Sequence, residues 1–273
     1  MSNSGFSLCK GLPLQGESLP EELSGKLSGK LPGKLTEQHS ISRSIVMHLL
    51  PGVIVTLLYI AFIPVVQVWG FPTVLALFLA VIFGVLPFQF GYVFYQAKKK
   101  NGSFSLKGVF AYDRRSPWWQ YALVTVLYVA WSVVCFLVLP KFYSGALMEN
   151  VFFWLPAWFI PGEAAGTSTA AVFVIILAGF LSDIPGAIAE EFYFRGILLP
   201  KVAWMGKLAP LFTTFLFAAY HLDSPYKFIE RFLSMLPIIY LVWRTKDMKM
   251  IIIPHCIVNA IGILLMAAEM LLK

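Results

Sequence analysis

The chain has 273 residues, of which 59% are hydrophobic and 13% are charged, and its mean hydropathy is +0.77. Soluble domains are about half apolar and about a quarter charged, so this composition excludes an ordinary soluble enzyme and predicts a multi-pass membrane protein. The net charge of +7 raises the question of nucleic acid, which depends on where the basic residues lie.

The first 44 residues are polar and contain no long apolar run. They are rich in Ser, Gly, Pro, Lys and Glu, and the tripeptide Gly-Lys-Leu occurs at 25–27, 29–31 and 33–35. This composition predicts a disordered tail over residues 1–44 without a role in chemistry. The tail is too long and too polar for a secretory signal, so residues 45–273 are expected to form the transmembrane domain with its first helix retained.

Seven apolar runs follow, separated by short charged joints. They cover residues 45–67, 71–95, 118–139, 170–199, 208–221, 232–243 and 250–271. A membrane span needs about 20 apolar residues, so the fifth and sixth runs are short and are expected to tilt, extend or cross incompletely. The fourth would be about 45 Å long as one helix, and the sequence at 183–186 predicts a break within it. The predicted fold is an all-α bundle of about seven to eight transmembrane helices.

The basic residues are distributed unevenly between the two sides of the predicted bundle. If the tail is inside, 16 of the 21 Lys and Arg fall in inner segments, and Arg195 lies within an apolar run. The outer segments hold four, which are Lys141, Lys227, Arg231 and Lys273. Because cytoplasmic loops carry the excess of Lys and Arg, this predicts a cytoplasmic N-terminus, in the plasma membrane of a bacterium. The positive charge is then explained by topology in the lipid bilayer, and a nucleic-acid partner is not expected.

Ionisable side chains inside a bilayer are costly and mark candidate sites, and the fourth run contains three of them. On a helix, Glu191 and Arg195 share a face, while Glu190 points about 100° away. This pattern predicts that Glu191 pairs with Arg195 and that Glu190 is free for chemistry. The alternative is a packing network that includes all three.

Two further runs carry histidines. His221 ends the fifth run, and His255 and Asn259 lie one turn apart on one face of the last run. Each motif alone also fits a hydrogen-bonded residue between helices. Along straight helices, Glu190 lies about 15 Å from the inner segment at Lys201. His255 lies about 8 Å from the one at Lys249, and His221 about 21 Å from the one at Lys207. One buried polar pocket could therefore collect all of them.

These motifs resemble those of the CPBP family of CAAX proteases and bacteriocin-processing enzymes, also described as the Abi or CAAX prenyl protease type. The family pattern of E-E-x-x-x-R, F-x-x-x-H and H-x-x-x-N or D stands here as Glu190-Glu191-x-x-x-Arg195, Phe217-x-x-x-His221 and His255-x-x-x-Asn259. The resemblance covers residues 170 to 271 approximately. It implies an intramembrane endopeptidase that hydrolyses a peptide bond in a membrane-associated substrate, either a prenylated tail or a small peptide.

Peptide hydrolysis requires an activated water, a stabilised oxyanion and a proton for the leaving amine. We expect Glu190 to act as the general base and then acid, His221 to hold the water, and His255 and Asn259 to stabilise the oxyanion. Glu191 and Arg195 would support them, and Arg195 could also receive a substrate carboxylate. A catalytic zinc on Glu190, His221 and His255 is the metal alternative, which the spacing does not decide.

Two other functions fit the same residues. Buried Glu, His and Arg also serve as relays in proton-coupled transporters, although no repeated half of these motifs is found. A scaffold or immunity-type membrane protein on the same fold would bind a partner without turnover. In that case replacement of Glu190 would leave its function intact.

Overall fold

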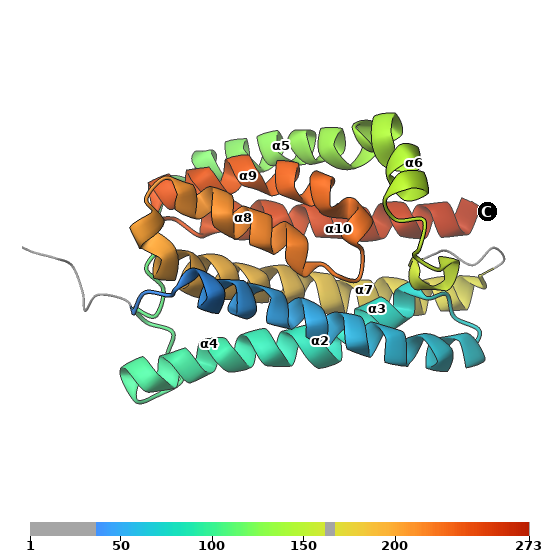
Figure 1. Ribbon diagram of the computed structural model, residues 1–273, viewed down its shortest axis with the longest axis horizontal. Helices are drawn as coiled ribbons and strands as arrows, with labels where there is room; N and C mark the ends of the chain where they lie inside the picture. The colour runs from blue at the N-terminus through green and yellow to red at the C-terminus, as the bar shows by residue number, and fades with distance from the viewer. Residues whose placement is uncertain (1–36, 162–166, 273) are drawn as a thin grey trace, which may run out of the picture. The chain divides into compact units, whose positions relative to one another are not determined.

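The computed structural model describes residues 37–161 and 167–272, which are helical with connecting loops and contain no β-strand (Figure 1). The prediction made for residues 1–36 lies outside the described residues. The helices are α2 (Ile41–Val68), α3 (Val74–Ala80), α4 (Leu86–Asn101), α5 (Trp118–Val133), α6 (Pro140–Asn150), α7 (Thr169–Glu190), α8 (Leu208–Tyr220), α9 (Phe228–Thr245) and α10 (Lys249–Leu272). The predicted all-α helix bundle is confirmed.

Five helical stretches of the described chain are long and apolar enough to cross a membrane. They are Ile41–Val68, Val74–Asn101, Trp118–Val138, Thr169–Met205 and Lys249–Leu272. Helix α8 has 13 residues, too few for a hydrocarbon core of about 30 Å at 1.5 Å per residue. It therefore ends inside the bundle, as its short apolar run had suggested.

Three of these stretches contain a wider, π-helical segment. One joins α3 to α4 (Val81–Val85), one follows α5 (Val134–Val138), and one continues α7 (Glu191–Leu198) before a 3₁₀ segment, Leu199–Met205. π-Helical turns are rare and occur frequently at functional sites. The third begins directly after Glu190, which is the candidate catalytic residue.

The predicted break at 183–186 is wrong, because α7 continues as an α-helix through Pro185 to Glu190. Side chains of α10 reach the carbonyls beside this proline. Asn259 Nδ2 donates to the Asp183 carbonyl at 3.1 Å, and Cys256 Sγ lies 3.9 Å from the Ile184 carbonyl. These contacts tie α10 to α7 beside the proline, whereas the carbonyl that lacks a donor because of Pro185 is that of Leu181, one turn earlier.

Helices α7 and α10 pack side by side, and α8 packs against both α2 and α9 (Figure 1). The closest approach between α2 and α8 is at Gly52. A Cβ atom added there would lie 1.8 Å from the Tyr220 carbonyl oxygen. Only glycine permits this approach, which fixes the position of the last turn of α8 and of the residue after it, His221.

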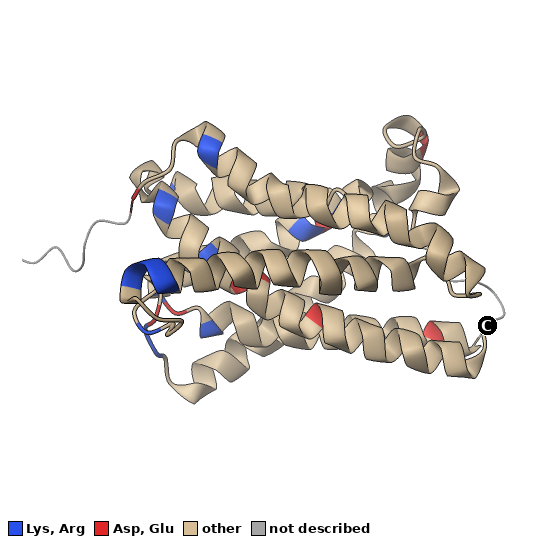
Figure 2. Cartoon of the chain, turned by 90° about the horizontal axis from the view of Figure 1, so that it is seen from below, with Lys and Arg blue, Asp and Glu red and all other residues tan. Residues whose placement is uncertain are grey.

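The basic residues gather at the end of the bundle opposite the C-terminus (Figure 2). Lys98, Lys99 and Lys100 end α4 there. Backbone hydrogen bonds join further basic segments at this end, from the Arg114 N–H to the Lys246 carbonyl at 2.9 Å and from the His39 N–H to the Lys201 carbonyl at 2.8 Å. The structure thus has one strongly basic end.

Candidate active site

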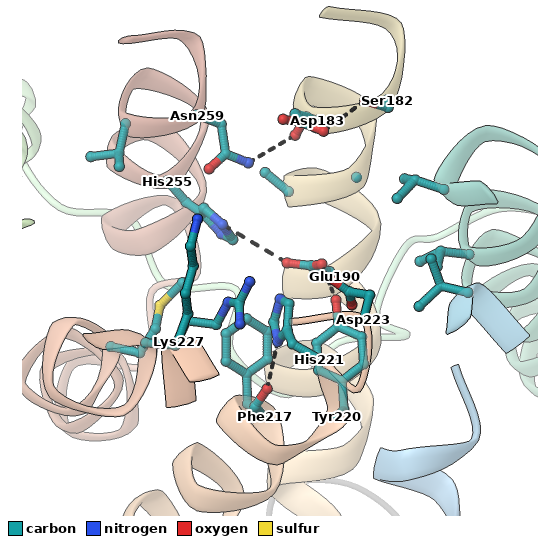
Figure 3. A pocket seen from close by; sticks show the side chains of 18 of the residues that line it. Ser182, Asp183, Glu190, Phe217, Tyr220, His221, Asp223, Lys227, His255 and Asn259 are labelled. Carbon is teal, nitrogen blue, oxygen red and sulfur yellow. Dashed lines mark hydrogen bonds and ion pairs between the residues drawn. The ribbon is translucent and has the colours of Figure 1, made fainter. Parts of the chain in front are cut away.

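A cavity of about 290 Å³ lies among α2, α3, α5, α7, α8, α9 and α10. Its walls include apolar side chains of α2, of α3, of the π-helical segment after α5 and of α10, among them Val55, Phe78, Phe136 and Val258. The cavity brings together the four residues predicted to be catalytic, which are Glu190, His221, His255 and Asn259 (Figure 3). They come from α7, from the residue after α8 and from α10.

Glu190 is the last residue of α7, and its carboxylate faces the cavity (Figure 3). The Tyr220 hydroxyl donates a hydrogen bond to Glu190 Oε1. The other oxygen, Oε2, lies 3.8 Å from His255 Nε2. Within the described residues no Lys or Arg nitrogen lies within 4.0 Å of this carboxylate. Glu190 is therefore oriented by a hydroxyl and left without a permanent cation.

Glu191 has the opposite environment. Its side chain is fully buried and does not line the cavity. Glu191 Oε1 accepts hydrogen bonds from Arg195 Nη1 at 3.2 Å and from His255 Nδ1 at 2.9 Å. The predicted pairing of Glu191 with Arg195 is therefore present, and the contact with His255 is an addition that the sequence did not indicate.

Arg195 is buried beneath the site rather than open to it. Its side chain is 2% exposed, and its guanidinium carbon lies 4.0 Å from the centre of the Phe217 ring. This contact explains the phenylalanine of the second motif, since its ring covers the cation from the side of α8. Arg195 does not line the cavity.

His255 is held between the two glutamates. A carboxylate paired with an arginine can only accept a hydrogen bond, so the proton between His255 and Glu191 is assigned to His255 Nδ1. In the neutral imidazole this leaves a lone pair on Nε2, which faces Glu190. Glu191 thus fixes both the tautomer and the orientation of His255.

His221 and Asn259 complete the site. His221 follows the last residue of α8, and its Nδ1 donates to the Phe217 carbonyl at 3.0 Å, leaving Nε2 as an acceptor. Asn259 uses Nδ2 to bond the Asp183 carbonyl. One further N–H and the carbonyl oxygen of this amide remain available to the cavity.

Several lining residues were missed by the sequence analysis. They are Asp183, Tyr220, Asp223, Lys227 and Arg231. The sequence analysis assigned Lys227 and Arg231 to an outer segment, because it treated the fifth apolar run, which forms α8, as a complete crossing of the membrane. Their spacing of four residues at the start of a short apolar run is the signal that could have located them on one helix face.

A catalytic zinc would require the side chains of Glu190, His221 and His255 to converge on one point. Over residues 37–161 and 167–272, no group of three His, Cys, Asp or Glu side chains is arranged to hold a metal ion. Glu190, His221 and His255 share the cavity without forming such a group. The donor set therefore does not fit a metal, and no catalytic step is derived through one.

Comparison with known families matches residues 168–261 to the family described as type II CAAX prenyl endopeptidase Rce1-like. This segment, about a third of the chain, is similar to the Rce1-like family. The matched segment contains all three motifs, so the resemblance inferred from them is confirmed. No curated protein and no solved structure matches the chain.

The Rce1-like match supports an intramembrane endopeptidase of the CAAX type and indicates protease activity. The apolar helices and the family together identify a multi-pass membrane protein. Such a protein acts on a membrane-associated peptide substrate within a lipid bilayer.

Proposed function

We propose that this protein hydrolyses a peptide bond near the C-terminus of a membrane-anchored substrate, using a water molecule activated by Glu190. The observation that carries the proposal is the cavity that gathers Glu190, His221, His255 and Asn259 inside the bundle. The family description supports a prenylated substrate, and the apolar walls of the cavity fit aliphatic side chains of the peptide.

Glu190 and His255 define the place for the water. Their facing atoms are 3.8 Å apart, too far for a direct hydrogen bond. A water at about 2.8 Å from each atom can contact both in a bent arrangement. Glu190 takes a proton from this water as it attacks the carbonyl carbon, and returns it to the leaving amine when the C–N bond breaks.

The developing oxyanion needs hydrogen-bond donors. The remaining N–H of Asn259 can donate to it, and His255 can do so through Nε2 when that nitrogen carries a proton. Glu191 would hold His255 in place and balance its charge, much as a carboxylate orients a catalytic histidine in other hydrolases. His221 Nε2 would accept a hydrogen bond from the water or from the leaving amine.

A cleavage assay on the purified protein in lipid nanodiscs tests this mechanism. The substrates are fluorescence-quenched peptides with an S-farnesylated cysteine four residues from a free C-terminus. Glu190→Gln keeps the size of the side chain and removes the base, so we expect kcat to fall by about 10²-fold or more. Glu149→Gln changes an exposed acid on α6 and should leave the rate unchanged.

The metal alternative is tested in the same assay. Because the donor side chains do not form a metal site, we expect full activity after exhaustive treatment with chelator, with less than one metal ion per ten protein molecules by elemental analysis. Activity that disappears with the metal and returns with zinc would contradict the metal-free mechanism. Cleavage that survives in Glu190→Gln would contradict the role of Glu190.

A further inference from the structure

The cavity contains two cationic side chains that the proposed mechanism does not use. Lys227 precedes α9 and Arg231 lies one turn further along the chain, and both line the cavity. Lys227 is exposed and Arg231 is half-buried. In Figure 3 the side chain of Lys227 points into the cavity. Neither residue belongs to the three motifs that identify the family.

These cations lack carboxylate partners among the described residues. No Asp or Glu oxygen there lies within 4.0 Å of either of them. Arg231 donates instead to Ser224, from Nη1 to the carbonyl at 2.9 Å and from Nη2 to Oγ at 2.6 Å. A guanidinium has five N–H donors, so three remain.

The acidic residues nearest in sequence do not form ion pairs with these two cations among the described residues. Asp223 Oδ2 accepts a hydrogen bond from Ser224 Oγ at 2.6 Å, and this serine is the partner of Arg231. Glu230 is buried and does not line the cavity. Asp223 also lines the cavity, but within the described residues Arg231 hydrogen-bonds to Ser224 and not to Asp223, so N–H groups of the guanidinium remain available. An anion in the cavity would meet both cations on the wall formed by α9.

We propose that Lys227 and Arg231 bind the free C-terminal carboxylate of the peptide and thereby hold its end in the cavity. This inference deepens the proposed function and rests on it. A cavity of about 290 Å³ is at the lower limit of ligand pockets, roughly 300 Å³, and holds only a short peptide segment. The end of that segment carries an obligatory negative charge, and these two residues supply the matching positive charge.

The cations and the groups proposed for catalysis come from different segments of the chain. Glu190 and His255 act from α7 and α10, while Lys227 and Arg231 approach from the α9 side. A carboxylate held at α9 stays apart from the negative charge of Glu190, and the chain between them presents its peptide bond to the water. Arg195 cannot serve this purpose, since it is buried and paired with Glu191.

A binding experiment tests the proposal without requiring turnover. The probe is a pool of N-acetylated aliphatic tripeptides, prepared as free acids and as C-terminal amides, and binding is measured by thermal stabilisation of the Glu190→Gln protein in nanodiscs. We expect the acids to bind at least tenfold more tightly than the amides, because charge-assisted hydrogen bonds are the strongest available. In Lys227→Gln/Arg231→Gln on the same background, this preference should disappear.

Two controls keep the result interpretable. Lys141→Gln removes an exposed cation at the start of α6, outside the cavity, and should retain the full preference. Lys227→Gln alone keeps the Arg231–Ser224 contacts intact, so it should fold normally and lose at least threefold of the preference. Equal binding of acids and amides, or a preference that survives in the double variant, would overturn the proposal.

The two proposals fail in different ways. If the wild type cleaves the farnesylated peptides but acids and amides bind alike, the carboxylate site is wrong and the protease function stands. If acids bind preferentially but no peptide is cleaved, the function is wrong and a carboxylate-binding site remains.

Discussion

Glu190 and Glu191 are neighbours in the chain and have different surroundings. Glu190 faces a cavity and accepts a hydrogen bond from Tyr220, whereas Glu191 is fully buried and bonded to Arg195 and His255. This division places a carboxylate that faces the cavity beside one that is buried. The buried carboxylate orients His255, whose Nε2 lies 3.8 Å from the carboxylate that faces the cavity.

Replacing Tyr220 by phenylalanine tests how far this orientation matters. The change removes the hydroxyl that donates to Glu190 and leaves the ring packing against Phe194 and Phe217. A hydrogen bond to a charged group contributes about 1.5–3 kcal/mol, so we expect kcat to fall by roughly ten- to a hundredfold with little change in KM. The assay is cleavage of the farnesylated peptides.

Tyr240→Phe is the matched control, because that hydroxyl donates to the Lys207 carbonyl at 2.8 Å and lies outside the cavity. It should retain the wild-type rate. An unchanged kcat in Tyr220→Phe would show that Glu190 does not need this hydroxyl.

For single residues, the sequence predicted which side chains belong to the candidate site, but it predicted only some of the contacts between them. The spacing of Glu191 and Arg195 predicted their ion pair, because both lie on one helix face. The Glu191–His255 contact joins residues 64 positions apart, and helix periodicity carries no information about such a pairing. Tyr220 adjoins a predicted site residue, yet only its position against α7 reveals that it serves Glu190.

Among the elements, α8 decides where the site lies. It is too short to cross a bilayer, and at its end Gly52 of α2 packs against the Tyr220 carbonyl. The apolar runs of the sequence fall on helical segments, five of which are long and apolar enough to cross a membrane, while α8 is not. Hydropathy found α8 as a short run, but it could not show that Lys227 and Arg231 turn back into the bundle.

Gly52→Ala tests the contact between α2 and α8. The new Cβ would lie 1.8 Å from a backbone oxygen, so α8 must shift, and overpacking of this kind costs about 1–3 kcal/mol. We expect a lower unfolding temperature and at least a tenfold loss of cleavage, since Tyr220 and His221 move with the helix end.

Gly91→Ala in α4 provides the comparison, because nothing lies within 4 Å of the Cβ it would add. It should preserve both stability and activity. If Gly52→Ala behaves like Gly91→Ala, the close approach does not position the site.

The predicted break in α7 is absent, although the helix contains Pro185. Pro185 removes the donor to the Leu181 carbonyl, yet α7 continues as one helix to Glu190. Beside the proline, Asn259 and Cys256 of α10 contact the carbonyls of Asp183 and Ile184. The sequence shows the proline, whereas these contacts between α10 and α7 join residues more than 70 positions apart.

For the whole molecule, the charge distribution predicts an orientation. The structure gathers Lys and Arg at the end of the bundle where α4 ends (Figure 2), and Lys227 and Arg231 belong to the cavity rather than to the opposite end. Because positively charged loops remain in the cytoplasm, we expect the basic end to be cytoplasmic.

Cysteine labelling in intact cells tests this orientation. In a protein with Cys9, Cys135 and Cys256 replaced by alanine, Ser105→Cys marks the basic end and Ser144→Cys marks the opposite one, and both positions are exposed. A membrane-impermeant maleimide should label only Ser144→Cys until the cells are permeabilised. Labelling of Ser105→Cys alone in intact cells would reverse the orientation.

The measurement that tests the central claim most directly compares newly formed peptide termini in membranes that contain the wild type or Glu190→Gln at equal abundance. Catalysis by Glu190 predicts a set of termini, lying close to the original chain ends, that is present with the wild type and absent with Glu190→Gln. Identical termini in the two membranes, with both proteins folded, would contradict the protease and favour a scaffold that binds its partner without cutting it.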